Sequence, residues 1–168
     1  MQTGQGSELK SYTFDTPIGR MNVCEKENGI CAVTIWDKVV LRTDKESLGT
    51  EEQPTELLLK AEQELLEYFA GKRKEFDLPL HLEGTPFQLK VWNALLTIPY
   101  GETRSYKEIA RLTGNEKACR AVGMANNRNP VMILVPCHRV IGADGGLVGY
   151  GGGLPLKERL LELEQNYV

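Results

Sequence analysis

Histidine and cysteine are scarce in this chain of 168 residues, which has two histidines and four cysteines. The cysteines lack the short paired spacings that zinc sites and disulfide frameworks use, and they stand at positions 24, 31, 119 and 137. Cys24 and Cys31 with His81 are one ligand short of a zinc site, so we expect no metal and no other cofactor. This cysteine usage favours a reducing compartment, and we expect a cytoplasmic protein, or a nuclear one if the source is eukaryotic.

Long hydrophobic runs are also missing. No stretch approaches the roughly 20 apolar residues that a membrane-spanning helix needs. The polar segment 1–10 lacks the apolar core of a secretory signal peptide, so we expect neither a membrane partner nor export. The composition is that of an ordinary globular protein, and the chain is long enough to bury a core.

Neither sign of charge dominates, but the charges are unevenly distributed. The net charge is -3, yet residues 85–168 hold ten basic and seven acidic side chains, whereas residues 1–84 hold ten and sixteen. Within 86–139 the count is eight basic to three acidic. Such a segment can neutralise the phosphates of a nucleic acid, although a solvated helical surface has the same pattern.

The first half of the chain predicts a small antiparallel sheet followed by a helix. The turns Thr16–Gly19 and Asn28-Gly29, the second of which tolerates positive φ at both residues, separate strands at 11–14, 20–25 and 30–36. Apolar residues then recur at helical spacing over 55–69 and stop before Gly71. We expect a scaffold domain at 1–84 and a second domain at 85–168, because Gly84 and the change in charge balance mark a boundary there.

The second half predicts a series of short, well-punctuated helices. Thr85-Pro86-Phe87-Gln88 and Ser105-Tyr106-Lys107-Glu108 are capping boxes that start the first two helices. The second helix stops at Thr113-Gly114, and Asn115 can cap a third helix at about 116–127. Two short helices around a glycine turn match a helix-turn-helix, although such pairs also occur in proteins that never bind DNA.

The third predicted helix has two unlike sides. Small and apolar residues should pack inward, namely Ala118, Ala121, Val122 and Ala125. The opposite side carries Cys119, Arg120, Gly123 and Asn127, which apart from Arg120 are small. A second backbone could approach this side closely, which favours a helix that faces a groove over a surface without a partner.

The strongest chemical signal is the stretch from Ile133 to Val140. A strand-like aliphatic run breaks at Pro136, where the chain should turn and expose Cys137, His138 and Arg139. A thiol is activated beside cationic or proton-accepting groups, so Cys137 is our candidate nucleophile. Neighbouring strand residues point to opposite faces, so either a turn redirects Cys137 and His138 or a water links them.

This stretch, Pro136-Cys137-His138-Arg139-Val140, resembles the active-site signature of the O6-alkylguanine-DNA alkyltransferases. The resemblance extends from about 87 to 164 through Ser105-Tyr106, Gly114-Asn115, Arg120-Ala121-Val122-Gly123, Asn129-Pro130 and Gly152-Gly153-Leu154. It implies an α+β fold, in which a small ribonuclease H-like sheet-and-helix domain precedes a mainly helical catalytic domain. It also implies a DNA repair protein that transfers the alkyl group of O6-alkylguanine irreversibly to its own Cys137, once per molecule. O4-alkylthymine stays open as a second substrate.

The family's roles carry over to particular residues of this chain. Cys137 would be the nucleophile, and His138 would act as its base through a water. Glu164 would hold His138 in place, and Tyr106 would donate a proton to the departing base. Asn129 would link the third helix to the active-site segment. The guanine pocket would consist of Val140, Tyr150, Gly151, Gly152 and Lys157, with Gly151 where some relatives have serine. A monomer would bind duplex DNA with alkylated guanine through the minor groove, with contacts from Ser105, Tyr106, Arg120, Ala121, Gly123, Asn127 and Arg128. Arg120 would fill the place of the flipped base.

The pattern around Glu164 supports its role independently. In a helix at about 155–165 the leucines at 156, 160, 161 and 163 define the buried side, and Glu164 lies angularly between Leu160 and Leu161. A buried carboxylate is costly unless paired, which suits a group that orients a histidine. Lys157, on the same side of the helix, is a competing structural partner.

Other readings stay open at this point. Tyr106 also fits a half-buried core aromatic, Arg120 a phosphate clamp or a surface charge, and the glycines at 149–153 a flexible loop. The main alternative function is a non-catalytic helix-turn-helix DNA-binding module with a redox-sensing cysteine. A Cys-His hydrolase without a nucleic-acid partner is a further alternative.

Overall fold

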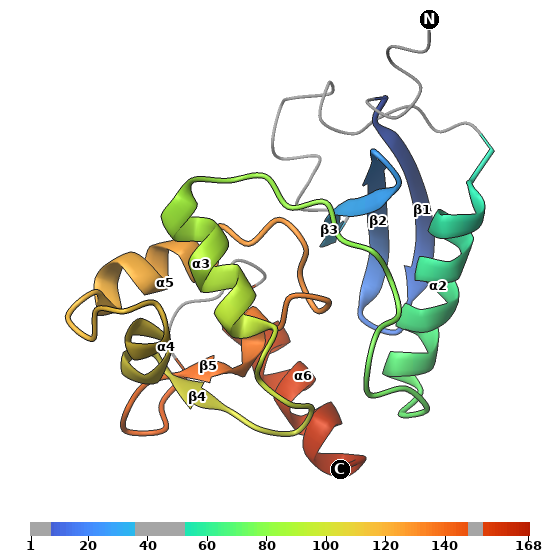
Figure 1. The fold of residues 1–168 in the computed structure, drawn as a ribbon. Helices are drawn as coiled ribbons and strands as arrows, with labels where there is room; N and C mark the ends of the chain where they lie inside the picture. Colours follow the sequence, from blue (N-terminus) through green and yellow to red (C-terminus); the bar gives the residue numbers. More distant parts are fainter. Residues whose placement is uncertain (1–7, 36–52, 148–152) are drawn as a thin grey trace, which may run out of the picture. The chain divides into compact units, whose positions relative to one another are not determined.

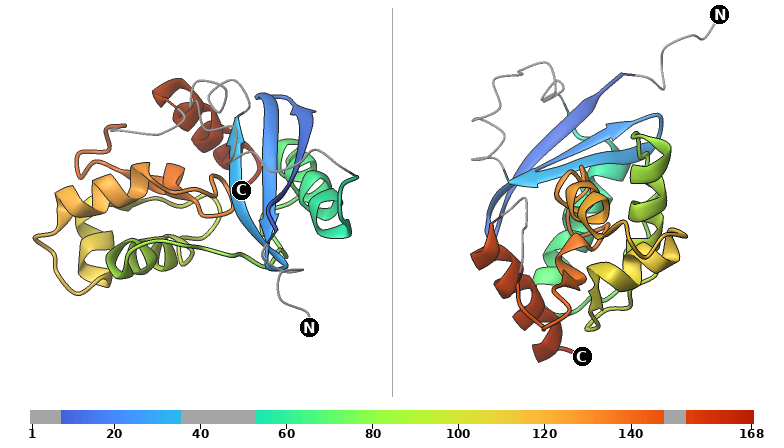
Figure 2. Two further views of the ribbon diagram at one scale, coloured as in Figure 1. Left: turned by 90° about the horizontal axis from the view of Figure 1, so that it is seen from above. Right: turned by 90° about the vertical axis from the view of Figure 1, so that its left-hand side faces the viewer.

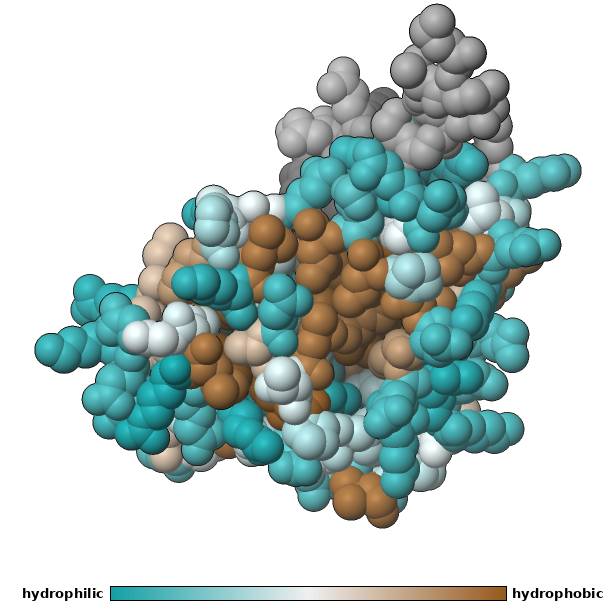
Figure 3. Space-filling model, viewed as in Figure 1, coloured by the Kyte–Doolittle hydropathy of each residue, from teal (hydrophilic) through white to brown (hydrophobic). Residues whose placement is uncertain are grey.

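The computed structural model describes residues 8–35, 53–147 and 153–168. The chain divides into two compact units, Met1–Leu82 and Glu83–Val168 (Figure 1). Hydrophilic side chains project from the outer surfaces of both units on the face that Figure 3 shows. Within the described ranges, no helix combines the length and the apolar character that crossing a bilayer requires.

The first unit is a three-stranded antiparallel sheet with one described helix across it. The strands β1 (Lys10–Thr16), β2 (Gly19–Lys26) and β3 (Gly29–Ile35) pair in the order β1-β2-β3. Helix α2 (Glu56–Phe69) lies along one face of the sheet (Figure 2). Its buried residues Leu58, Ala61, Leu65 and Tyr68 form a core with Phe14, Met21, Val23 and Val33. The predicted strands and helix are confirmed, and Gly71 has a positive φ just beyond the helix end.

The β2–β3 hairpin turns one residue earlier than expected. Lys26 pairs with Gly29, and the two residues with positive φ are Glu27 (51°) and Asn28 (63°). Gly29 is required for a different reason, because a Cβ there would lie 2.9 Å from the backbone nitrogen of His81. The segment around His81 runs beside β3, since Ile30 N donates to Pro79 O and His81 N donates to Ile30 O, both at 2.8 Å.

The second unit is mainly helical. Its helices are α3 (Pro86–Leu95), α4 (Tyr106–Leu112), α5 (Cys119–Asn127), the short 3-10 helix η2 (Cys137–Arg139) and α6 (Leu154–Asn166). Two short strands, β4 (Arg104–Ser105) and β5 (Val140–Ile141), pair in parallel. The mixture of a small sheet domain and a helical domain confirms the predicted α+β class.

Local capping signals place the first two helices of this unit correctly. Thr85 with Gln88 and Ser105 with Glu108 both form complete capping boxes. Helix α4 ends at Thr113, before Gly114 with a φ of 98°.

Helix α5 differs from its prediction in start and phase. It begins at Cys119, and the Asn115 side chain accepts a hydrogen bond from Lys117 N in the preceding turn instead of capping the helix. Its buried residues are Val122, Ala125 and Asn126, whereas Ala121 is exposed. Packing against α3 and α4 sets this phase, and the amide of Asn126 is tolerated inside because it donates to Cys137 O at 3.2 Å.

The aliphatic run before Pro136 is a buried loop and not a strand. Ile133 has a φ of 73°, Leu134 N donates to Met132 O, and Val135 N donates to Val131 O. The loop is closed by Asn129, whose Oδ1 accepts from Val131 N at 2.9 Å and whose Nδ2 donates to Val135 O at 2.8 Å. The chain turns at Pro136 as predicted, but the three residues that follow are buried and not exposed.

Candidate active site

Cys137 and His138 lie in the short helix η2, deep inside the second unit. Cys137 is 3% exposed and His138 is 0% exposed. The segment is held from one side by α5 and the residues after it, through the hydrogen bonds of Asn126 to Cys137 O and of Asn129 to Val135 O. The turn therefore gives the thiol and the imidazole fixed positions in a site with little access to water.

The imidazole of His138 is held by Glu164 of α6. The distance from His138 Nε2 to Glu164 Oε2 is 2.5 Å, and His138 Nδ1 has no hydrogen-bond partner among the described residues. Burial, with the charges of Arg139 and Lys157, lowers the pKa of His138 despite the opposing effect of Glu164. The lowered pKa favours the neutral imidazole; because a carboxylate only accepts, the proton of that form belongs on Nε2, which makes Nδ1 the basic nitrogen.

Arg139 points to Glu164, and this partner was missed at the sequence level. Its Nε lies 2.8 Å from Oε1 and its Nη2 lies 3.1 Å from Oε2 of Glu164, while Nη1 donates to Ile98 O at 2.7 Å. Although burial raises the pKa of Glu164, the hydrogen bonds that His138 and Arg139 donate to it, together with the positive charge of Arg139, hold it at about 2. The sequence pattern predicts Arg139 as a cation beside the thiol, whereas its guanidinium pairs with Glu164. The need of a buried carboxylate for a counter-charge could have indicated this partner.

Lys157 and Tyr106 also lie close enough to Cys137 to interact with its charge. Lys157 is fully buried, donates to Val140 O at 2.5 Å, and has its Nζ 5.8 Å from the centroid of the Tyr106 ring. Burial lowers the pKa of Lys157, and a negative charge on Cys137 opposes that shift. Burial and the same charge raise the pKa of Tyr106. A cation and a phenol thus accompany the thiol.

Helix α6 buries Glu164, Leu160 and Lys157 on one side, as predicted, but three of the four leucines expected there are not fully buried. The leucines at 156, 161 and 163 are only half-buried. The two charged residues are inside because each has a hydrogen-bonded partner, Lys157 at Val140 O and Glu164 at His138 and Arg139.

The remaining predicted site residues fall into three groups. Val140 is buried in β5, and Ser105 caps α4 directly before Tyr106. On and after α5, Arg120, Ala121, Asn127 and Arg128 are exposed, and Gly123 is half-buried near the Tyr106 ring. Tyr150, Gly151 and Gly152 lie outside the described residues.

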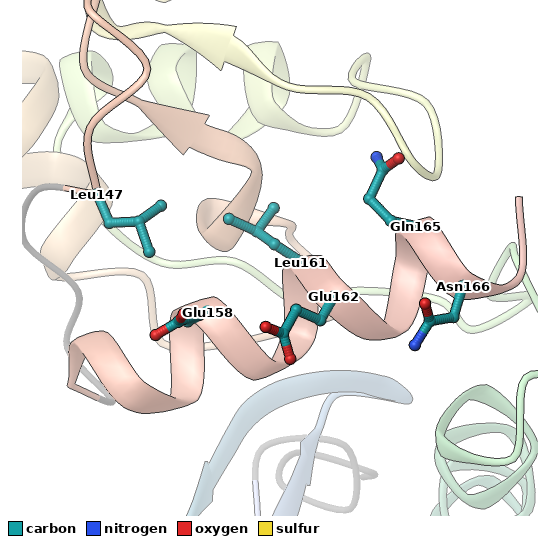
Figure 4. A pocket seen from close by; sticks show the side chains of 6 residues that line it. All are labelled: Leu147, Glu158, Leu161, Glu162, Gln165 and Asn166. Atoms are coloured by element: carbon teal, nitrogen blue, oxygen red, sulfur yellow. The ribbon is translucent and has the colours of Figure 1, made fainter.

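An open pocket of about 600 Å³ lies on the outward side of α6, away from these residues. It is lined by Leu147, Glu158, Leu161, Glu162, Gln165 and Asn166 (Figure 4). Leu147 and Leu161 point toward one another across it, and both carboxylates belong to α6. Two acidic side chains make this pocket unsuited to a phosphate backbone.

Among the described residues, no group of three or more His, Cys, Asp or Glu side chains is placed to bind a metal ion. Cys24, one of the residues considered for zinc, donates from Sγ to Asn22 Oδ1 at 3.1 Å. Burial and the neighbouring Cys31 raise the pKa of Cys24 to about 12, which leaves it an unreactive thiol.

Comparisons with known proteins agree on both units. The family model described as 6-O-methylguanine DNA methyltransferase, DNA binding domain, matches residues 86–166, and the one described as its ribonuclease-like domain matches residues 9–82. The chain is 51% identical to a methylated-DNA–protein-cysteine methyltransferase of Methanosarcina acetivorans, over 90% of this chain and 95% of that protein. It is 47% identical to the constitutive enzyme of that name in Bacillus subtilis, over 91% and 93%.

Solved structures give the same result. The chain is similar to the O6-methylguanine methyltransferase of Mycobacterium tuberculosis, with a TM-score of 0.82, 44% identity and coverage of 95% of this chain and 94% of that one. The M. tuberculosis OGT in complex with DNA matches with the same TM-score and coverage at 46% identity. The fold of the two units is therefore that of a 6-O-methylguanine DNA methyltransferase. The chain belongs to the methylated-DNA–protein-cysteine methyltransferase family.

Proposed function

We propose that this protein repairs DNA by moving the alkyl group of O6-alkylguanine in a duplex onto Sγ of its own Cys137. The observation that carries the proposal is the buried Cys137-His138 pair, in which His138 Nε2 is tied to Glu164 and Nδ1 is left basic. Membership of the family supplies the substrate class.

The chemistry is a displacement at carbon. Cys137 gives its proton through a water to His138 Nδ1, and the thiolate attacks the alkyl carbon. The new sulfur–carbon bond replaces the carbon–O6 bond, and the electron pair of the broken bond leaves with guanine. Tyr106 donates a proton to the departing base and regains one when His138 releases the proton that it took from Cys137, so both side chains return to their starting state. Overall, the thiol hydrogen ends on guanine and the alkyl group on sulfur, so no cofactor is needed.

The product explains why each molecule would act once. A thioether has no good leaving group, so neither water nor the displaced guanine reverses the step. We therefore propose a stoichiometric reaction of one alkyl group per chain. O4-alkylthymine remains a candidate second substrate.

The DNA surface that we propose is the exposed side of α5 with its C-terminal end. Arg120, Asn127 and Arg128 are exposed there, with the small residues Ala121 and Gly123 beside them. We infer that α4 and α5 act as a helix-turn-helix which enters the minor groove as a monomer. A buried thiol cannot reach a stacked base, so the damaged nucleotide must flip out, with Arg120 in its place and Tyr106 and Ser105 at its phosphate.

The flipped guanine would occupy a pocket around Val140, Lys157, Tyr150, Gly151 and Gly152. Lys157 donates to Val140 O and so orders one wall of that pocket. A DNA repair protein works where the DNA is, so we place this protein in the cytoplasm of a prokaryotic source or the nucleus of a eukaryotic one.

The test is the intact mass of the protein after incubation with a duplex that carries one O6-methylguanine. We expect a gain of one methyl group that saturates at one per chain, maps to Cys137 and is absent in Cys137→Ala. A methyl group on Cys119 would refute the assignment. No gain with the duplex still bound would favour the non-catalytic binding module, and repeated turnover of an ester would favour the hydrolase.

A further inference from the structure

Four donors converge on the buried carboxylate of Glu164. They are His138 Nε2 at 2.5 Å, Arg139 Nε at 2.8 Å and Nη2 at 3.1 Å, and Gly101 N at 3.2 Å. Glu164 is 1% exposed and Arg139 is 6% exposed, so the fork of the guanidinium meets the carboxylate away from water. One hydrogen bond from His138 Nε2 to Glu164 would be enough to orient the imidazole, which leaves the two contacts of Arg139 to be explained.

Charge explains what Arg139 adds. A buried carboxylate that faces a histidine alone stabilises the imidazolium, since an opposite charge nearby favours the charged form. An imidazolium already has a proton on Nδ1 and cannot accept the proton of Cys137. A guanidinium is permanently charged, so Arg139 satisfies the carboxylate without a second proton on His138.

We propose that Arg139 is a positioning residue for alkyl transfer. By neutralising Glu164, it keeps His138 as an uncharged imidazole with its proton on Nε2 and its lone pair on Nδ1. The inference rests on the proposed function for the transfer step, but the protonation state of His138 is measurable without DNA.

The charged groups around His138 come from two elements, η2 and α6, and they shift its protonation in opposite directions. Arg139 and Cys137 belong to η2, and Glu164 and Lys157 belong to α6. Arg139 and Lys157 disfavour the imidazolium and Glu164 favours it, while burial has the largest effect and favours the neutral ring. The ring of Tyr100 lies 5.7 Å from the Arg139 guanidinium and completes its enclosure.

The first experiment observes the imidazole directly. The chain has only two histidines, so ¹⁵N-histidine labelling gives two rings, and His81→Gln assigns them. We expect His138 to be neutral and protonated at Nε2 at pH 7, and to stay neutral below the ordinary histidine pKa of about 6.5. An imidazolium at pH 7, or a neutral ring protonated at Nδ1, would overturn the proposal.

The second experiment removes the counter-charge with Arg139→Gln. We expect the pKa of His138 to rise by at least about one unit and the transfer rate at low pH to fall about tenfold, with recovery as the pH is raised. A purely structural role would lower the rate by the same factor at every pH, and an unchanged pKa would refute the charge argument. Arg139→Lys retains the charge and should restore the neutral imidazole at pH 7. If Arg139→Gln does not fold, the protonation state of His138 in Arg139→Lys and in the wild type still tests whether a positive charge at this position keeps the imidazole neutral.

Arg73→Gln is the matched control. Arg73 also holds two carboxylates, with Nε 2.9 Å from Glu67 and Nη1 3.6 Å from Glu64, but it belongs to the first unit. Its loss should leave the pH profile and the His138 spectrum unchanged. If the wild type never alkylates Cys137, the proposed function fails, and the spectra of His138 still report whether Arg139 sets its charge.

Discussion

At the scale of single residues, the pairing of buried charges in the second unit leaves His138 available as a base and Cys137 as a nucleophile. Arg139 pairs with Glu164, and Lys157 is the cation associated with Cys137. His138 is then the uncharged member of the cluster. A thiolate formed at Cys137 meets the positive charge of Lys157, whose ammonium group also donates to Val140 O and lies over the Tyr106 ring.

Lys157→Met tests the role of that cation. Methionine keeps most of the buried apolar stem but removes the charge that stabilises the thiolate. We expect transfer from an O6-methylguanine duplex to slow by at least about tenfold, which corresponds to roughly 1.4 kcal/mol of lost stabilisation. The measurement is the single-turnover rate. Lys60→Met, on the surface of α2 and paired with Asp77, is the control and should be without effect.

The same residues predict how stability depends on pH. The pKa of His138 is lowered in the folded state, so below about pH 6.5 the unfolded chain binds a proton that the folded one does not, and stability falls as the pH falls. The pKa of Glu164 is held at about 2, so a further loss begins as the pH falls below about 4.5, where the unfolded carboxyl protonates. Each such proton costs up to about 1.4 kcal/mol per pH unit.

Urea denaturation between pH 7.5 and pH 5 measures the first of these losses. The free energy of unfolding should decrease over this range in the wild type and in His81→Gln. His138→Gln should remove most of the decrease. A decrease that survives in His138→Gln would show that another group is responsible.

At the scale of elements, the success of sequence reasoning depended on the range of the interactions. The capping boxes at Thr85 and Ser105 are bonds between residues three apart, so the sequence alone located α3 and α4. The start of α5 and its buried side depend on packing against α3 and α4, which local patterns do not encode. The Arg139–Glu164 pair joins residues 25 apart, and only the folded chain shows it.

The loop 129–136 also shows that a local sequence pattern does not determine the structure, because a strand was predicted where a buried loop is found. Its aliphatic residues predicted a strand because burial produces the same apolar run in a strand and in a buried loop. What distinguishes the two is Asn129, whose side chain replaces strand pairing by bonding Val131 N and Val135 O. This loop carries Pro136 and, after it, the nucleophile, so its closure sets the position of Cys137.

Asn129→Ala tests that closure. The variant leaves the buried Val131 N without its acceptor, which costs about 1–3 kcal/mol, and removes one of the two hydrogen bonds to Val135 O, which keeps its bond from Cys137 N. We expect a loss of about 2 kcal/mol in the free energy of unfolding and slower alkylation of Cys137. Asn115→Ala is the control, because Asn115 is exposed, bonds only in a turn and does not cap α5. A loss near the ~1 kcal/mol of a missing helix cap at Asn115 would contradict this account.

At the scale of the whole molecule, the charges separate by unit as well as by side chain. The acidic half, residues 1–84, bears the excess negative charge, and the half with Cys137 bears the positive one. A protein with a net charge of -3 can therefore still bind DNA, provided that the basic surface makes the contact. The exposed Arg120 and Arg128 are the members of that surface on and beside α5.

Arg120 and Arg128 should contribute differently to DNA binding. If each neutralises one phosphate, Arg128→Ala should reduce the slope of log affinity against log salt by about 1. Arg120→Ala should slow transfer from the duplex by about tenfold or more and leave transfer from the free base O6-methylguanine unchanged, because only the duplex needs its flipped base replaced. Lys72→Ala, an equally simple loss of charge in the acidic unit, should change neither quantity. Equal slowing of the duplex and free-base reactions in Arg120→Ala would mean that Arg120 supports the site and does not contact the DNA.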